Sequence, residues 1–207
     1  MSIEFDANFE IAPWRSPLAR ALHRNRSQPF CRFLQLATVR AEGTPANRTV
    51  VFRGFLDGSD RLMMISDRRS QKTAQIQQNP NAEACWYFTK TREQFRLSGE
   101  LTLVTAETTD PAFSAARQQV WQKISDNARL QFAWSHPKEL RTEASNFEPP
   151  APEANSPLST FCLLLLKPHT VDYLSLRGEP QTRLVYQQKD HSAQERSAEW
   201  SFVEVNP

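Results

Sequence analysis

Short runs of apolar, β-branched and aromatic residues, bounded by turn signals, recur along this chain and predict β-strands. Glycine-containing turns at 41–45 and 57–60 join the first three runs into an antiparallel meander. A polar turn at 90–93 joins two more. The predicted strands span residues 32–40, 46–55, 61–66, 82–89, 94–104, 161–166, 171–176, 183–188 and 200–205.

Helical patterns are fewer and short. After a polar start, predicted to be irregular up to Ala12, helical spacing appears at 18–23, at 70–78 between Ser70 and Asn79-Pro80, and in two segments after Asp110-Pro111. These last two helices are expected at 112–124 and 127–132. Because the strands follow one another without crossover helices, the pattern predicts a mainly β protein with α additions, a β-barrel rather than a doubly wound sheet.

Length and composition agree with one domain over residues 1–207, in which the four prolines of segment 143–157 mark a loop or insert. No run of about 18 apolar residues could span a membrane, and the first residues do not resemble a secretory signal. The chain has three cysteines, no Cys-x-x-Cys pair and four histidines. A disulfide framework and a metal site are therefore not expected, and a reducing cytoplasm is the expected location.

Charge is distributed unevenly along a nearly neutral chain. The formal net charge is +2, which gives no reason to expect nucleic acid as a partner. Residues 48–96, however, contain nine basic and five acidic residues. A local basic excess of this size is typical either of a solvated basic face or of a site for a small anionic ligand.

The common catalytic and phosphate-binding motifs are absent, and five glycines in the whole chain leave no glycine-rich phosphate loop. An anion would therefore be held by side chains and a helix N-terminus. The segment 67–72, Asp-Arg-Arg-Ser-Gln-Lys, offers both where a strand gives way to a helix. In the strand that contains Arg48 and Arg53, a period of two places these two cations on opposite faces. Gln94 adds a donor and an acceptor that fit the edge of a flat heterocycle.

The order Arg-x-Val-x-Phe-Arg at 48–53, Ile65-Ser66 at a strand end, Ser70-Gln71-Lys72 opening a helix, and then Gln94 resembles the pyridoxamine 5′-phosphate oxidase family. The resemblance covers about residues 32–207 and is greatest to the divergent branch seen in cyanobacteria and plants. It implies an FMN-binding split β-barrel, a homodimer with the FMN site at the subunit interface, and an oxidoreductase whose flavin, rather than a catalytic side chain, carries the chemistry.

The resemblance also assigns cofactor residues. Arg48 and Lys72 match the phosphate ligands, whereas Gln71 replaces an arginine whose charge Arg68 or Arg69 would supply instead. Arg53 matches a lysine between cofactor and substrate, and Gln131 matches a contact from the second subunit. The full predicted cofactor set is Arg48, Thr49, Val50, Val51, Arg53, Ile65, Ser66, Ser70, Gln71, Lys72, Gln94, Gln131, Tyr173 and Arg183.

The substrate side of the resemblance is less complete. Arg53, Phe113 and Arg117 match positions that hold the phosphorylated vitamin B6 substrate, but the family's Arg-Leu-His-Asp-Arg reads Glu-Pro-Gln-Thr-Arg at 179–183. Two functions therefore stay open. One is oxidation of a small phosphorylated or planar substrate, with pyridoxamine or pyridoxine 5′-phosphate first and a place in pyridoxine biosynthesis. The other is FMN binding without vitamin B6 turnover, as a carrier, sensor or flavin reductase. A split barrel that binds haem is a third, disfavoured by the few histidines.

Overall fold

In a computed structural model of the protein, residues 10–189 and 199–207 are described and form eight strands, four α-helices and two 3-10 helices. The irregular start predicted before Ala12 lies, for residues 1–9, outside the described part of the chain. The strands are β1 (Phe33–Val39), β2 (Pro45–Phe55), β3 (Leu62–Asp67), β4 (Asn81–Phe88), β5 (Glu93–Val104), β6 (Phe161–Ser175), β7 (Thr182–Gln188) and β8 (Trp200–Val205). The helices are α1 (Arg15–Asn25), α2 (Gln71–Gln78), α3 (Pro111–Lys123), α4 (Asp126–Leu130), η1 (Gln131–Ala133) and η2 (Ala144–Phe147).

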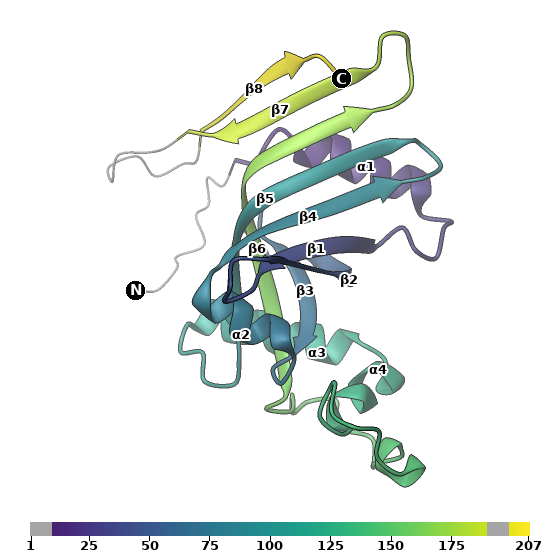
Figure 1. Cartoon of the computed structure of the whole chain (residues 1–207), viewed down its shortest axis with the longest axis vertical. Coiled ribbons are helices and arrows are strands. Elements are labelled where there is room, and N and C mark those ends of the chain that lie inside the picture. Colours follow the sequence, from purple (N-terminus) through teal and green to yellow (C-terminus); the bar gives the residue numbers. More distant parts are fainter. Residues whose placement is uncertain (1–9, 190–198) are drawn as a thin grey trace.

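The strands make one antiparallel sheet in the order β3-β2-β1-β4-β5-β6-β7-β8. A further pairing between β3 and the first half of β6 joins the sheet to itself, so β1–β6 close into a barrel. The strands β7 and β8 extend the sheet beyond the barrel, next to the second half of β6 (Figure 1). The predicted mainly β barrel with α additions is confirmed.

The first half of β6 is buried on both faces. Leu164 and Leu166 belong to the core inside the barrel, whereas Phe161, Leu163 and Leu165 belong to a second core. The helix α3 covers this second core from outside and contributes Trp121, whose side chain is fully buried. A continuous apolar run is expected where both faces of a strand are covered.

One predicted break in the sheet is wrong. The sequence predicts two separate strands at 161–166 and 171–176, but β6 runs without interruption from Phe161 to Ser175. The ladder with β5 shifts its register here: Ser98 pairs with Thr170, and Gly99 pairs with Pro168. The extra residue on β6 forms a bulge, and a bulge is one of the places where a strand tolerates proline.

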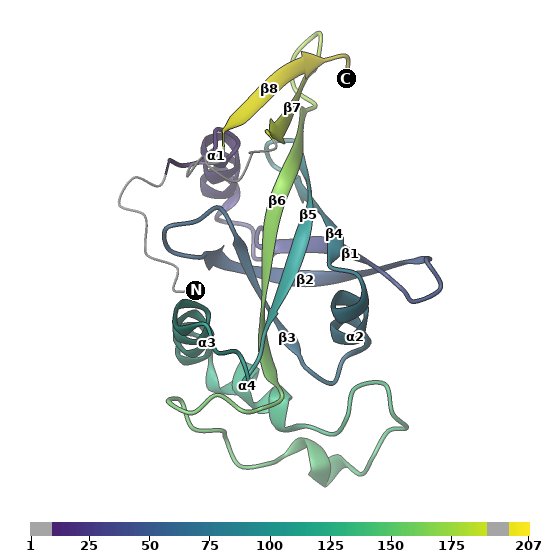
Figure 2. The ribbon, with the colours of Figure 1, turned by 90° about the vertical axis from the view of Figure 1, so that its left-hand side faces the viewer.

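The helices cover different parts of the barrel. The helix α1 lies against one face of the extended part of the sheet, and α3 lies beside the opposite end of the barrel (Figure 2). The helix α2 packs on β1 and β5 and buries Ile76 in the barrel core. The segment 143–157 is irregular apart from η2, as predicted. Within the described residues, no helix is both long and apolar enough to cross a membrane.

Candidate functional site

A cavity of about 310 Å³ opens where the start of β2 meets the N-terminus of α2. Four of its lining side chains are cations, and none is a carboxylate. Such a lining favours a small anion with several oxygens, such as a phosphate. The cavity is lined by Arg40, Ala46, Asn47, Arg48, Ser70, Gln71, Lys72, Gln75, Pro137 and Lys138.

Arg48 is held in position on the wall of this cavity. Its Nη1 donates to the hydroxyl of Thr38 at 2.7 Å and to the carbonyl of Leu36 at 3.1 Å, and its Nη2 donates to Oε1 of Gln75 at 3.0 Å. Burial lowers the pKa of the Arg48 guanidinium, and the nearby Arg40 lowers it further. Among the described residues, no carboxylate pairs with Arg48, so a bound anion would relieve the repulsion between Arg48 and Arg40.

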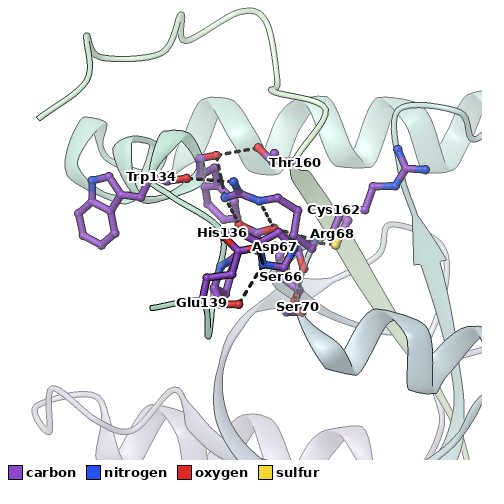
Figure 3. Close-up of polar contacts among 12 residues, drawn as sticks. Ser66, Asp67, Arg68, Ser70, Trp134, His136, Glu139, Thr160 and Cys162 are labelled. Atoms are coloured by element: carbon purple, nitrogen blue, oxygen red, sulfur yellow. Dashed lines mark hydrogen bonds and ion pairs between the residues drawn. The ribbon is translucent and has the colours of Figure 1, made fainter. Parts of the chain in front are cut away.

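Lys72 lies opposite, at the first turn of α2. Its Nζ donates to the hydroxyls of Ser66, at 2.9 Å, and Ser70, at 3.0 Å. Cys162 from β6 donates to the carbonyl of Ser66, which ties Ser66 to β6 (Figure 3). Burial lowers the pKa of the Lys72 ammonium, and Arg48 lowers it further. Lys72, Ser66 and Ser70 therefore form one connected group of donors beside Arg48.

The N-terminus of α2 adds backbone donors. Ser70 is the N-cap residue and has an extended backbone, but its side chain caps no amide of the helix. The first amides of a helix carry a partial positive charge and bind anions readily. The expectation from the sequence that a strand end, a helix start and cations meet at one phosphate-sized place thus agrees with the geometry.

Two of the lining cations were not found from the sequence. Lys138 lies in the segment after α4, and its Nζ donates to Oε1 of Gln71 at 2.5 Å. Arg40 follows β1 and enters the lining through the β1–β2 turn. Only the fold brings these residues to α2, and no local motif marks either of them.

Arg68 and Arg69 do not supply the charge that Gln71 lacks, which corrects the expectation from the sequence. Arg69 makes a bidentate contact with Asp67, at 3.0 and 2.7 Å, and donates to the carbonyl of Trp134 at 2.9 Å. Arg68 points away from this group and pairs with Glu107 at 2.5 Å (Figure 3). In the structure, Lys138 is the cation that contacts Gln71.

A second group of predicted residues lies on the outer face of the sheet. Antiparallel pairing connects Thr49 to Cys85 and Arg96 through Gln35 of β1, and residues paired in this way share a face. Gln94 lies two positions before Arg96 and therefore points to the same side, where the thiol of Cys85 is 3.9 Å from its Oε1.

Arg183 joins this face from β7. It pairs with Leu174, which in turn pairs with Gln94. Its Nε and Nη2 donate to Asp172 at 3.0 and 2.7 Å, so the guanidinium has a fixed orientation. Asp172 also lies 3.7 Å from Arg96. A flat ring placed against this face would meet an amide and two cations.

Arg53 has a buried donor that lacks an acceptor within the described part of the chain, and a bound cofactor or substrate could supply that acceptor. Its Nε is buried and has no hydrogen-bond partner among the described residues. Burial lowers the pKa of the Arg53 guanidinium, and Arg32 lowers it further. A buried donor without an acceptor is costly, and a bound group that offers an acceptor would remove this cost.

Tyr173 does not share the face of Gln94 and Arg183, so its predicted contact with the flavin stays a prediction. Tyr173 pairs with Phe95, so it points to the face opposite Gln94 and Arg183. Its ring packs on Phe95 with 4.8 Å between centroids, and its hydroxyl donates to Glu93 at 2.8 Å. Leu174 is the β6 residue that lies on the face of Gln94.

Arg117 has a structural role in this fold, and its predicted role in substrate binding stays a prediction. Its guanidinium is buried and donates to the carbonyls of Phe161, at 3.0 and 2.9 Å, and Leu158, at 2.6 Å. The fully buried Trp121 donates to the carbonyl of Glu153 one turn further along α3. These two side chains hold the segment 153–161 against α3.

The other predicted residues have mixed positions. Val50 points into the barrel core, Ile65 packs against the core under α3, and Phe113 packs there beneath Arg61. Val51, two residues after Thr49, shares the outer face. Gln131 is exposed on η1, outside the lining of the cavity, so its contact with a second subunit stays a prediction.

The barrel, the cationic cavity beside α2 and the polar outer face together define an FMN-binding split-barrel protein. Residues 11–105 match the family model described as pyridoxamine 5′-phosphate oxidase, FMN-binding domain. The chain is 35% identical over 198 residues, 95% of this chain and 98% of the relative, to pyridoxine/pyridoxamine 5′-phosphate oxidase 2 from Arabidopsis thaliana. The chain belongs to the pyridoxamine 5′-phosphate oxidase family, and its cofactor is FMN.

Solved structures agree with this assignment. A pyridoxamine 5′-phosphate oxidase-related, FMN-binding protein from Nostoc punctiforme is 51% identical, with a TM-score of 0.90 over 96% of this chain and 100% of that one. PhzG from Burkholderia lata, solved with tetrahydrophenazine-1-carboxylic acid, is 18% identical, with a TM-score of 0.73 over 100% of this chain and 98% of that one, and shows the same fold. The predicted resemblance to the branch seen in cyanobacteria and plants is confirmed.

Proposed function

We propose that this protein is an FMN-dependent oxidoreductase that acts on a small phosphorylated or planar substrate, as pyridoxine/pyridoxamine 5′-phosphate oxidases do. The observation that carries the proposal is the cavity lined by four cations and no carboxylate, which lies beside α2 on a chain of this family. When bound, FMN would supply a hydride acceptor at N5 of its ring, and oxygen would be the final electron acceptor.

The side chains of this protein bind the cofactor and orient it. Arg48 and Lys72, with the hydroxyl of Ser70, hold the phosphate of the cofactor, and the Lys138 ammonium closes the same cavity. Gln94 offers a donor and an acceptor to the edge of the ring. Arg183, fixed by Asp172, places a positive charge near the ring, where it favours the negatively charged reduced form.

Arg53 is the residue proposed to face both cofactor and substrate. Its unpartnered Nε and its burial suit an acceptor on a bound molecule. The Arabidopsis relative is named a pyridoxine/pyridoxamine 5′-phosphate oxidase, so pyridoxine or pyridoxamine 5′-phosphate is the first substrate to test. Transfer from C4′ of such a substrate requires orientation rather than an activated nucleophile, which agrees with the lack of a catalytic side chain in the predicted set.

A second candidate function is FMN binding without vitamin B6 turnover, as a carrier, a sensor or a flavin reductase. Two observations favour it. Arg117 is committed to backbone carbonyls, and residues 179–183 lack the family's arginine and histidine. Each of these two differences from the family would weaken the binding of a phosphorylated pyridine.

The assembly proposed with both functions is a homodimer in which FMN lies at the subunit interface. It is supported by the side chains of Phe33 and Tyr87, which are 46% and 44% exposed. Their strands, β1 and β4, form part of the outer face that carries Gln94. A single domain with an insert at 143–157 and a cytoplasmic location stay predictions, as does a place in pyridoxine biosynthesis.

The test is an anaerobic visible spectrum of the protein after loading with FMN and desalting, recorded before and after addition of pyridoxine 5′-phosphate. The oxidase proposal expects the flavin band to survive desalting and then to bleach. Admission of air should restore the band, and the product should be the aldehyde.

Each other outcome decides between the two functions. A band that survives but does not bleach with pyridoxine or pyridoxamine 5′-phosphate rejects the vitamin B6 substrates and supports the second candidate. Bleaching by a reduced nicotinamide instead would identify a flavin reductase. Loss of the flavin on desalting would contradict the phosphate site built by Arg48 and Lys72.

A further inference from the structure

A second cationic cavity lies far along the sheet from α2, under the C-terminal half of α1. It has a volume of about 350 Å³ and opens into a neighbouring hollow of about 510 Å³. Arg20 and Arg24 line the first cavity from α1, Arg177 lines it from the β6–β7 turn, and Glu93 lines it from the start of β5. None of these residues takes part in the cofactor site.

The two arginines of α1 are unneutralised. Arg20 and Arg24 are four residues apart, so they lie one above the other on one side of the helix, where like charges repel. No acidic residue lies in α1. Among the described residues, neither guanidinium has a hydrogen bond or an ion pair. Within the described part of the chain, the helix therefore presents two adjacent guanidinium groups without a partner to the cavity.

Glu93 adds a hydrogen-bond acceptor to this cationic cavity. Its side chain is 7% exposed, and its Oε1 accepts from the hydroxyl of Tyr173 at 2.8 Å. Its Oε2 is buried and has no partner among the described residues. A buried carboxylate oxygen without a donor is costly, and an ammonium or hydroxyl group in the cavity would satisfy it.

The walls of the cavity are fixed in place. Asn25, fully buried at the end of α1, donates to the hydroxyl of Thr91 at 2.9 Å and accepts from the amide of Lys90 at 3.1 Å. Arg177 donates to the carbonyl of Lys90 at 2.7 Å. These contacts tie α1, the β4–β5 turn and the β6–β7 turn to one another, so the elements that carry the three arginines are already in place when a ligand arrives.

We propose that this cavity is a second ligand site, distinct from the FMN site, which binds a small phosphorylated amine. The guanidinium groups of Arg20, Arg24 and Arg177 would hold the phosphate. Three guanidinium groups can donate to the three terminal oxygens of a phosphate, whereas a carboxylate offers only two oxygens. Oε2 of Glu93 would accept from the ammonium at the other end.

The test uses the FMN-loaded protein, so that the first phosphate cavity is already filled. Titration calorimetry in phosphate-free buffer measures the affinity for O-phosphoethanolamine, for inorganic phosphate and for ethanolamine. The proposal expects phosphoethanolamine to bind at least about tenfold more tightly than phosphate, and ethanolamine not to bind measurably.

Variants separate the two ends of the ligand. The double variant Arg20→Gln/Arg24→Gln should lose binding of both phosphorylated probes, while Lys123→Gln, an exposed cation on α3, should keep it. Glu93→Gln should leave the phosphate affinity in place and remove the preference for phosphoethanolamine. A thermal melt of each variant checks that it is folded.

The proposal is overturned if the FMN-loaded protein binds phosphoethanolamine no better than phosphate, or if the double variant binds it as the wild type does. If Glu93→Gln does not fold, Tyr173→Phe replaces it. This change frees Oε1 of Glu93 as well, and it should leave the preference for the amine intact or increase it.

Discussion

Lys138 and Gln71 are joined by a hydrogen bond of 2.5 Å between Nζ and Oε1, although they lie 67 positions apart in the chain. The contact closes the cavity beside α2 with a cation at the position where the family's usual arginine is replaced by glutamine. The backbone of Lys138 has a φ of 69°, in the left-handed region that a lysine rarely adopts. The segment around Lys138 is thus held in a costly conformation that brings the ammonium to the cavity.

The first prediction concerns this lysine. Lys138→Gln should weaken FMN binding by about tenfold, since one charge-assisted contact to the phosphate is lost. Riboflavin has the same ring but no phosphate, so its affinity should not change. Quenching of flavin fluorescence on titration with apoprotein measures both constants.

The control is Lys123→Gln, which removes an exposed lysine on α3. An equal loss of affinity for FMN and riboflavin would mean that Lys138 shapes the ring site or the fold. An unchanged affinity for FMN would remove Lys138 from the phosphate site.

Most of the fold could be predicted from the sequence because its strands are short, apolar and separated by strong turn signals. The turn at 57–60 and the cap region before Gln71 mark boundaries that the structure reproduces to within about two residues. The break predicted between residues 166 and 171 is wrong for a long-range reason. Gly99, on another strand, allows β5 to approach so closely that the chain continues past Pro168.

The site could be predicted only where its residues are close in sequence. The contact of Lys72 with Ser66 and Ser70 depends on one strand end and one helix start, which a local pattern can reveal. Lys138 enters from a distant irregular segment, and nothing local shows where such a segment folds. Tyr173 is assigned by resemblance alone, and the resemblance does not show which face of the sheet its side chain takes.

The second prediction concerns Gly99. A Cβ atom at this position would lie 2.0 Å from the carbonyl oxygen of Lys167, so Gly99→Ala forces the two strands apart. We expect a loss of about 2–4 kcal/mol in the free energy of unfolding, measured by urea denaturation. Gly43→Ala is the matched control, since its φ of 84° is strained for alanine but nothing lies within 4 Å of the added atom. It should cost about 1 kcal/mol. Equal effects of the two changes would show that the strands can separate freely at Gly99.

The third prediction is a dependence of stability on pH that arises at Cys162. Burial raises the pKa of this thiol to about 12, from about 9 in the unfolded chain. The unfolded state therefore loses the proton first, and the free energy of unfolding falls as the pH rises from about 9 towards about 12, by on the order of a few kcal/mol. Cys162→Ala should lose less stability than the wild type between pH 9 and pH 11.

The comparison is between slopes, because alanine also leaves a small cavity that lowers stability at every pH. Cys31→Ala, at a half-buried thiol, serves as the control. A thiol reagent at neutral pH gives an independent readout, since Cys162 should react only when the protein unfolds. Equal slopes for the wild type and Cys162→Ala would contradict the prediction.

The last prediction separates a structural from a substrate role for Arg117. Its guanidinium satisfies the carbonyls of Phe161 and Leu158, so Arg117→Met leaves buried acceptors without donors. We expect a loss of about 2–4 kcal/mol in the free energy of unfolding and earlier proteolysis of the segment 153–161. Lys123→Met on the same helix should change neither. The affinity for FMN and, where the protein oxidises pyridoxine 5′-phosphate, the KM should stay within about twofold of the wild type. A large rise in KM without loss of stability would instead return Arg117 to the substrate site, and the segment 153–161 would then have to move away from α3 before the substrate binds.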